Sequence, residues 1–308
     1  MPPEIIHALA IVGPTASGKS ALALSIAADA PIEIVSCDSL MVYSGMDIGT
    51  GKPTRAERDL VPHHLLDVVS PAEPYHAARW AHAARRAITG IAGRGRLPVI
   101  VGGTGLYLRA LLNGLFEAPP PDEAIRERHR EEACTLGVET LHARLVTVDP
   151  ETAARVLPRD LLRISRALEI FEQTGEPISV LRRRAIPPVG LTAAVVVLDP
   201  PLDRLRSDIA RRFDAMMDAG LVEETRALRA AFGNDARPLQ SLGYSQMGDF
   251  LDGRAALPEA VAAAKIATAT YARRQRTFFR KQMGARRVVE VPAAQDVLAW
   301  WRASVSRV

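Results

Sequence analysis

The stretch AIVGPTASGKSALAL, which runs from Ala10 to Leu24, contains the pattern G-x-x-x-x-G-K-S between Gly13 and Ser20. The apolar run Ile5–Val12 ahead of this pattern predicts a buried strand, and the apolar residues at helical spacing behind it predict a helix. A strand, a glycine-rich turn and a helix in this order are the context of a phosphate-binding loop, whose backbone N–H groups converge on an anion at the helix N-terminus. The stretch therefore predicts a site for a diphosphate or a triphosphate.

Two side chains of the predicted loop carry its chemistry. Lys19 is placed to contact the terminal phosphate oxygens, and Ser20 offers a hydroxyl to a Mg²⁺ ion, which we expect as the cofactor. The same pattern is typical of ATP-binding and GTP-binding proteins, so the loop alone leaves the identity of the ligand open. The predicted phosphate-binding residues are Gly13, Pro14, Thr15, Ala16, Ser17, Gly18, Lys19 and Ser20.

An acidic residue is expected opposite this loop, and in this sequence it follows a different strand from the one that carries it in kinases. Phosphate-loop kinases and NTPases place a Mg²⁺-binding Asp after a second apolar strand. Here the apolar run Pro98–Val101 is followed by Gly102–Thr104 without an acidic residue, whereas Asp38 follows the run Ile32–Ser36. Because the carboxyl ends of parallel strands face a common crevice, we expect Asp38, Thr104 and the loop to meet there. Helix capping is the alternative role for Asp38 and Thr104.

The composition is that of a globular protein outside the membrane. The chain has 308 residues, of which 48% are hydrophobic and 24% charged, and no apolar run is long enough to span a bilayer. The N-terminus has no signal-peptide pattern. The two cysteines, Cys37 and Cys134, match no metal-binding spacing and fit a reducing compartment. We expect a cytoplasmic protein of about two domains.

Short apolar runs alternate with helical patterns over most of the chain, which predicts an α/β fold with a parallel sheet. The predicted strands are Ala8–Val12, Ile32–Ser36, Leu65–Val69, Pro98–Val101, Ala193–Leu198 and Val288–Val291. Between proline-rich segments near residues 118 and 188 the strand signal is missing, and 122–145 and 161–175 have helical patterns, the latter closed by Gly175. We therefore predict a P-loop NTPase-like core of residues 1–117 and 189–308 and an inserted all-helical subdomain of residues 118–188.

The positive charge of the chain is concentrated near its C-terminus. The segment Ala260–Val289 contains eight Lys or Arg and no Asp or Glu, whereas the whole chain has a net charge of +4. Tyr271, Phe278 and Phe279 stand among these charges, and basic residues interleaved with aromatic ones are typical of RNA-binding segments. A solvated basic helix is the alternative interpretation.

Six motifs, in this order and spacing, resemble the tRNA dimethylallyltransferases, and the resemblance extends over nearly the whole chain. These enzymes transfer an isopentenyl group to an adenosine beside the anticodon. The most specific motif is the second, which phosphate-loop kinases do not share. The motifs are GPTASGKS, DSLMVYSGMDIGTGKP, VGGTGLYLRALLNGL, ISRALEIFEQTG, LGYSQM and YARRQRTFFR.

The resemblance implies that the loop holds the diphosphate of dimethylallyl diphosphate instead of an NTP. It implies that Asp38 is the general base and that Lys19 and the loop N–H groups hold the leaving group. Thr15 and Arg212 would lie near the diphosphate, and Thr104 would lie beside the extruded adenine. Asp38, Thr15, Lys19 and Thr104 are thus the predicted catalytic residues.

The resemblance also implies that the partners are dimethylallyl diphosphate and the anticodon stem-loop of tRNA, bound by a monomer. Leu162 stands where the family commonly has Gln, so one hydrogen bond to RNA would be missing there. The implied tRNA-binding residues are Asp38, Ser39, Leu40, Met41, Thr104, Arg126, Leu162, Arg163, Arg166, Gln240, Gly243, Tyr244, Arg273, Arg274, Gln275, Arg276 and Arg280.

Two alternative functions compete with this one. A phosphate-loop kinase acting on a small molecule would account for Gly13–Ser20 but not for the motif around Asp38 or for the basic segment. A non-catalytic, nucleotide-dependent RNA-binding protein would account for the basic segment but not for a carboxylate opposite the phosphate loop.

Overall fold

The computed structural model describes residues 5–114, 116, 118–184, 189–282, 286–290 and 292–306. Along the chain the elements are β1 (Ile6–Val12), α1 (Lys19–Asp29), β2 (Ile32–Ser36), α2 (Arg55–Leu60), β3 (His63–His64), α3 (Ala77–Gly93), β4 (Leu97–Gly102), α4 (Gly105–Asn113), α5 (Glu123–Leu136), α6 (Val138–Val148), α7 (Pro150–Ala153), α8 (Leu161–Thr174), α9 (Ile178–Arg183), β5 (Leu191–Leu198), α10 (Leu202–Asp218), α11 (Leu221–Phe232), the 3₁₀ turn η1 (Arg237–Gln240), α12 (Tyr244–Leu251), α13 (Leu257–Gln282), β6 (Arg286–Val289) and α14 (Ala294–Val305).

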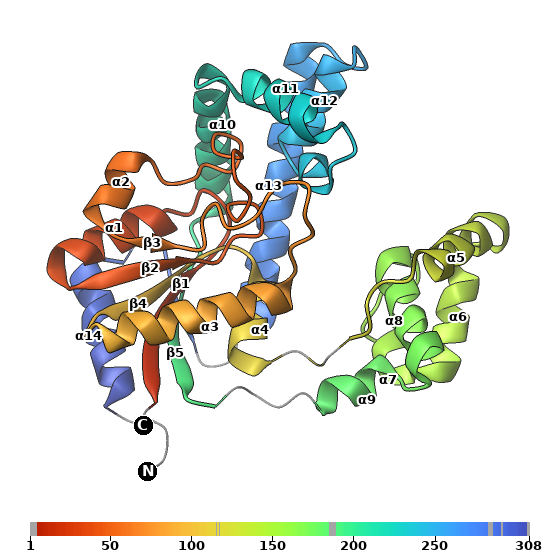
Figure 1. Ribbon diagram of the computed structural model, residues 1–308, viewed down its shortest axis with the longest axis horizontal. Helices are drawn as coiled ribbons and strands as arrows, with labels where there is room; N and C mark the ends of the chain where they lie inside the picture. Colours follow the sequence, from red (N-terminus) through yellow and green to blue (C-terminus); the bar gives the residue numbers. More distant parts are fainter. Residues whose placement is uncertain are drawn as a thin grey trace. The chain divides into compact units, whose positions relative to one another are not determined.

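The sheet of the core is parallel, as the alternation of strands and helices predicts. Its six strands follow the order β3-β2-β4-β1-β5-β6, and every pairing is parallel. The central strand β1 is buried from Ala8 to Val12, because helices cover both faces of the sheet. Helices α1 and α14 pack on one face and α3 lies across the other (Figure 1). The predicted P-loop-like α/β core is confirmed.

One predicted strand is wrong. The run Leu65–Val69 is not a strand. The strand β3 consists only of His63–His64, the two residues directly before this run. Leu65 and Asp67 have positive φ angles of 64° and 55°, which break an extended backbone. The side chain of Asp67 accepts a hydrogen bond from Lys52 Nζ at 2.6 Å, so a contact with a distant part of the chain accompanies the turn. The last predicted strand forms as β6, and its final residue, Val291, lies outside the described residues.

The insertion forms a compact unit of residues 113–188, beginning at Asn113 where the sequence predicted residue 118. Its described residues contain the helices α5 to α9 and no strand. As predicted, α8 ends at Gly175, which has φ 71° and donates its N–H to the carbonyl of Phe171 at 2.8 Å. The helical pattern over 122–145 forms two helices, because Gly137, with φ 88°, separates α5 from α6.

The other unit, residues 1–112 and 189–308, carries a group of helices beside the carboxyl ends of its strands. Helices α10, α11, α12 and α13 form this group, and α13 runs alongside the sheet (Figure 1). Because β1, β2 and β4 end facing these helices, residues from both sources surround the site described next. No described helix has the length and apolar character needed to cross a membrane.

Candidate active site

The phosphate loop joins β1 to α1 in a conformation that requires glycine. Gly13 has φ 151°, and a Cβ there would lie 2.4 Å from the carbonyl oxygen of Leu198 on the neighbouring strand β5. Gly18, with φ 87°, precedes α1, and no side chain caps that helix and no acidic residue stands in its first turn. The first N–H groups of a helix have no partner within the helix, so this end of α1 is suited to bind an anion.

Lys19 lies at the start of α1 and its ammonium group is directed back over the loop. Lys19 Nζ donates to the carbonyl oxygen of Pro14 at 2.5 Å. Burial and, to a smaller extent, the guanidinium of Arg212 lower the pKa of Lys19 to about 7, and Asp38 opposes part of this shift. A bound anion would favour the protonated form, so the site gains charge complementarity when a diphosphate enters.

Arg212 connects α10 with the loop. Its Nη1 donates to Thr15 Oγ1 at 3.2 Å and its Nη2 donates to the carbonyl oxygen of Thr50 at 2.9 Å. A Cβ on Gly51 would lie 2.1 Å from Arg212 Nη2, so the glycine makes room for the guanidinium. The two positive groups predicted beside the diphosphate, those of Lys19 and Arg212, are therefore neighbours, and each is held by contacts with the protein.

Asp38 follows β2 and holds the turn that comes after it. Asp38 Oδ1 accepts the N–H groups of Leu40 at 2.8 Å and of Met41 at 3.3 Å. Within the described part of the chain, Oδ2 has no hydrogen-bond partner, so this oxygen is available to a ligand. No helix begins here, because α2 starts only at Arg55. The helix-capping alternative for Asp38 is therefore wrong, although the side chain does cap a turn.

Thr104, at the end of β4, lies next to the turn that Asp38 holds. Its Oγ1 accepts the N–H of Ser39 at 3.1 Å, and its backbone N–H donates to the carbonyl oxygen of Cys37 at 3.1 Å. These bonds join the carboxyl ends of β2 and β4, as the parallel sheet predicted. The hydroxyl of Thr104 thus bonds with the turn, and its carbonyl oxygen accepts the N–H of Leu108 in α4.

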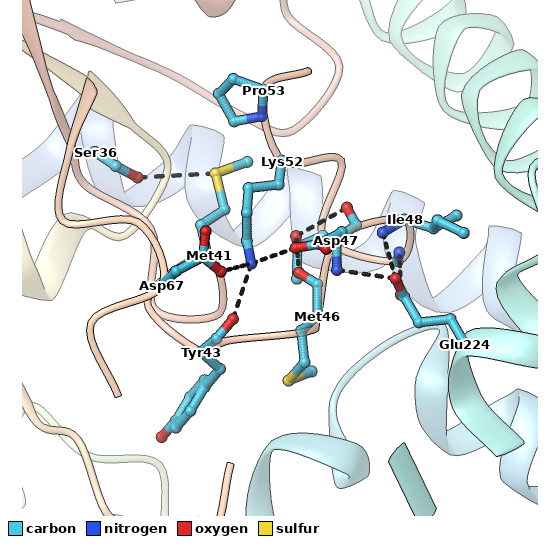
Figure 2. A network of polar contacts seen from close by, with 12 residues as sticks. Ser36, Met41, Tyr43, Met46, Asp47, Ile48, Lys52, Pro53, Asp67 and Glu224 are labelled. Carbon is cyan, nitrogen blue, oxygen red and sulfur yellow. Dashed lines mark hydrogen bonds and ion pairs between the residues drawn. The ribbon is translucent and has the colours of Figure 1, made fainter. Parts of the chain in front are cut away.

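The motif that begins with Asp38, residues 38–53, forms a loop outside the helices and strands. This loop folds around the ammonium group of Lys52. The side chain of Lys52 is 1% exposed and pairs with the carboxylates of Asp47 and Asp67, both at 2.6 Å. It also donates to the carbonyl oxygen of Tyr43 at 2.9 Å. Figure 2 shows the ammonium group between these three acceptors. A buried charge without partners is costly, so Lys52 and its acceptors hold the loop in one conformation.

A carboxylate from α11 holds the same loop from the other side. Glu224 accepts the N–H groups of three consecutive residues, Asp47 at 3.0 Å, Ile48 at 2.8 Å and Gly49 at 3.0 Å, as Figure 2 shows in part. The hydroxyl of Tyr244 donates to Glu224 Oε1 at 2.6 Å. No pattern in the sequence indicated this role for Glu224, because its partners lie far away along the chain.

One cavity of about 760 Å³ contains most of the predicted site. It lies entirely within the unit formed by residues 1–112 and 189–308. Apolar side chains of α10, namely Ile209, Phe213 and Met216, form part of its lining. The predicted residues that line it are Thr15, Ala16, Ser17, Gly18, Lys19, Ser20, Asp38, Ser39, Leu40, Met41, Arg212, Gln240, Gly243, Arg274 and Gln275.

Other predicted tRNA-binding residues of the core bond with the protein itself. Tyr244 is 1% exposed, so its side chain has no surface to offer a large ligand. Arg276 and Arg280 both form ion pairs with Asp199. Asp199 was not predicted as a site residue, although it follows the run Ala193–Leu198 in the same way that Asp38 follows its strand.

Of the remaining predicted tRNA-binding residues, Arg273 is exposed on α13 and four lie in the helical unit. Arg126 and Arg166 pair there with Glu169, whose side chain is 0% exposed. Leu162 is 82% exposed, and Arg163 is an exposed neighbour on α8. The tRNA-binding roles, in this unit and in the core, stay predictions.

The described residues contain no group of three or more His, Cys, Asp or Glu side chains that could hold a metal ion. Ser20 is exposed and lines the cavity at the start of α1. Any divalent cation here would therefore need oxygen ligands from a bound diphosphate and from water in addition to this hydroxyl. The donor set fits a Mg²⁺ ion that arrives with its ligand.

Two family models match the chain. The model described as IPP transferase matches residues 41–282, and the model described as isopentenyl transferase matches residues 6–67. A tRNA dimethylallyltransferase of Anaeromyxobacter sp. (strain Fw109-5) is 47% identical over 289 residues, which cover 94% of this chain and 96% of that protein. A tRNA dimethylallyltransferase of Koribacter versatilis (strain Ellin345) is 44% identical over 273 residues, which cover 88% and 89%.

Solved structures of similar fold agree with these matches. The full-length tRNA isopentenylpyrophosphate transferase from Bacillus halodurans superposes with a TM-score of 0.68 and 35% identity, covering 98% of this chain and 96% of that one. A eukaryotic dimethylallyltransferase acting on tRNA superposes with a TM-score of 0.74 and 25% identity, covering 98% of this chain and 77% of that one.

Proposed function

This chain belongs to the IPP transferase family of tRNA dimethylallyltransferases, and we propose on that premise that it transfers the dimethylallyl group of dimethylallyl diphosphate to tRNA. The acceptor that we propose is the N6 amine of an adenosine beside the anticodon. The products are N6-dimethylallyladenosine and diphosphate.

A single observation supports this reaction most strongly. One cavity is lined by the phosphate loop, the turn at Asp38 and the segment Gln240–Gly243. A prenyl donor held by its diphosphate and an adenine beside the Asp38 carboxylate can therefore meet in this cavity. A small-molecule kinase is not favoured, since β4 is followed by Gly103 and Thr104 and not by an acidic residue, and Asp199 after β5 is paired with two arginines. A non-catalytic RNA-binding protein is not favoured either, since it has no need of a carboxylate oxygen open to the cavity.

In the proposed mechanism the adenine leaves its stack and enters the cavity, because its N6 amine cannot be reached inside a stacked loop. The amine is a weak nucleophile and attacks C1 of the dimethylallyl group. The N6–C1 bond forms, the C1–O bond to the diphosphate breaks, and Oδ2 of Asp38 accepts the proton from N6. The Thr104 hydroxyl bonds with the same turn, and the resemblance implies that it would lie beside the base.

Diphosphate leaves with a developing negative charge that the enzyme has to hold. Lys19, Arg212 and the N–H groups at the start of α1 are positioned for this before the donor binds, so little reorganisation is needed during the reaction. Ser20 and the diphosphate oxygens would together hold a Mg²⁺ ion, which would neutralise part of the charge. The apolar side chains of α10 suit the dimethylallyl group.

Incubation with labelled dimethylallyl diphosphate and a tRNA transcript tests the proposed function. We expect label to enter the tRNA and an adenosine that carries the dimethylallyl group at N6 to be recovered after digestion. A parallel incubation with γ-labelled ATP and no donor should transfer nothing. Transfer from ATP to a small molecule, or tight RNA binding without any transfer, would contradict the proposal and favour one of the two alternatives.

Neutralising Arg273 and Arg274 together by substitution with Gln should weaken tRNA binding regardless of sequence. Both are exposed on α13, whereas Arg276 and Arg280 are engaged with Asp199. Each lost phosphate contact should lower the slope of log affinity against log salt by ~0.7–0.9. Filter binding of an anticodon stem-loop over a salt series measures this slope.

The matched control for this experiment is Arg226→Gln, which removes one exposed positive charge on α11, away from the cavity. It should leave the slope unchanged. An unchanged slope in the double variant as well would mean that the basic segment is a solvated helix and that tRNA binds elsewhere.

A further inference from the structure

Gln275 connects helix α13 to the phosphate loop and to the end of β4 through both ends of its side-chain amide. Its Oε1 accepts the backbone N–H of Thr15 at 2.9 Å, and its Nε2 donates to the carbonyl oxygen of Gly103 at 2.9 Å. The residue is 8% exposed. One buried amide therefore joins the loop after β1, the end of β4 and the middle of α13.

The orientation of this amide follows from its partners. Thr15 offers an N–H and Gly103 offers a carbonyl oxygen, so only one orientation of the amide satisfies both groups. The reverse orientation would place the amide NH₂ against an N–H and its oxygen against a carbonyl oxygen. A polar group that loses its partner in a buried site costs free energy, which keeps the side chain in this position.

Gly103 and Gly105 make room for α13. A Cβ on Gly103 would lie 2.3 Å from Gln275 Nε2, and a Cβ on Gly105 would lie 2.1 Å from a ring atom of Phe278. Both partners are on α13, one turn apart. The close approach of this helix is thus built into the turn after β4, next to Thr104.

These contacts give Gln275 a second role beside the one that the resemblance implies, which is to bind tRNA. The amide oxygen and the NH₂ group each have one protein partner, which leaves one lone pair and one N–H for a further contact. Its neighbours Arg273 and Arg274 are exposed, whereas Gln275 is buried. Gln275 lines the cavity, so a contact with RNA there would be made by an amide that is already held by the loop and by Gly103.

We propose that Gln275 is a positioning residue of the phosphate loop, which fixes the Thr15 peptide so that the rest of the loop presents its N–H groups to the diphosphate. The proposal rests on the proposed function, since it assumes that the loop binds the diphosphate of a prenyl donor. It has a direct consequence for that site. The Thr15 N–H is given to Gln275, so the diphosphate is held by the N–H groups further along the loop, together with Lys19 and the hydroxyl of Thr15.

Gln275→Met tests this role, because methionine has a similar length and shape but cannot form either hydrogen bond. We expect the dissociation constants of dimethylallyl diphosphate and of inorganic diphosphate to rise at least ~10-fold. The dissociation constant of an anticodon stem-loop should change less than ~2-fold. Isothermal titration with each ligand measures these constants, and thermal unfolding identifies the temperature range in which the variant is folded.

Gly103→Ala is a second variant that disturbs the same contact without changing Gln275. Its new Cβ would displace the amide, so the affinity for inorganic diphosphate should fall as it does in Gln275→Met. The matched control is Arg273→Gln, which changes an exposed residue of α13 two positions before Gln275. It should weaken binding of the stem-loop and leave the dissociation constants of dimethylallyl diphosphate and inorganic diphosphate unchanged.

The outcomes separate the two roles of Gln275. Weaker binding of the stem-loop with unchanged diphosphate binding in Gln275→Met would overturn the proposal and make Gln275 an RNA contact. Unchanged diphosphate binding in both Gln275→Met and Gly103→Ala would also overturn it. If Gln275→Met binds both diphosphate and the stem-loop more weakly, Gly103→Ala decides between the two roles. A lower affinity of Gly103→Ala for diphosphate supports the proposal, and an unchanged affinity overturns it. Failure of the proposed function is recognised separately, as a wild-type protein that binds inorganic diphosphate but transfers no dimethylallyl group.

Discussion

Lys19→Ala is expected to abolish measurable dimethylallyl transfer, with a loss of at least ~10³-fold in kcat/KM. The ammonium group lies over the loop, 2.5 Å from the carbonyl oxygen of Pro14, and no other lysine lines the cavity within the described residues. Without this ammonium group, the negative charge that develops on the diphosphate as the C1–O bond breaks is not compensated by a positive charge at the loop. Single-turnover transfer with labelled donor measures the effect, and ATP in excess should compete only weakly with the donor.

The pH dependence of donor binding provides a control on the role of this charge. Burial lowers the pKa of Lys19 to about 7 in the free enzyme, and a bound diphosphate raises it. Above pH 7 the donor therefore binds with uptake of a proton, and its dissociation constant should rise by up to ~10-fold per pH unit. In Lys19→Arg the side chain stays charged throughout this range, so the dissociation constant should be almost independent of pH. Equal pH dependence in the two proteins, or near-normal transfer by Lys19→Ala, would remove Lys19 from the mechanism.

Asp38→Asn is expected to lower the rate of the chemical step by ~10²–10⁴-fold, which is the usual contribution of a positioned general base. The amide oxygen of asparagine can still accept the N–H groups of Leu40 and Met41, so the turn after β2 is retained. Only the ability to accept a proton is lost. A single-turnover assay with saturating donor and tRNA measures the step, and filter binding should find little change in tRNA affinity.

Asp38→Ala is the companion variant, since it removes both the base and the acceptor that holds the turn. It should be at least as slow as Asp38→Asn and should also bind the stem-loop more weakly, because the N–H groups of Leu40 and Met41 lose their acceptor. A rate near that of the wild type in Asp38→Asn would show that another group accepts the proton.

The features that the sequence predicted correctly depend on residues close together in the chain. The spacing from Gly13 to Ser20, between an apolar run and a helical one, predicted the phosphate loop because strand, turn and helix are consecutive. Gly175 ends α8 as predicted, since a residue with positive φ stops a helix locally. The position of Asp38 at a strand end was also available from the sequence, because the carboxyl ends of parallel strands meet at one edge of a sheet.

The strand predicted at Leu65–Val69 failed because its conformation depends on a distant partner. The apolar residues Leu65, Val68 and Val69 favour a strand, but Asp67 pairs with Lys52 and takes a positive φ. A buried ammonium group without its carboxylates is far more costly than the loss of a few strand hydrogen bonds. Local propensity is weak compared with such a contact.

The sequence by itself determined the phosphate loop, the parallel sheet and the place of Asp38 at a strand end, since each follows from periodicity and spacing over short segments. Only the tertiary structure decided what the other polar side chains do. Arg276 and Arg280, which charge predicts as RNA contacts, also pair with Asp199, and Gln275 bonds with Thr15 across 260 residues. From the residue type it follows that a buried charged or amide side chain needs a partner. The fold decides which partner lies within reach, because hydrogen bonds and ion pairs act only at short distance.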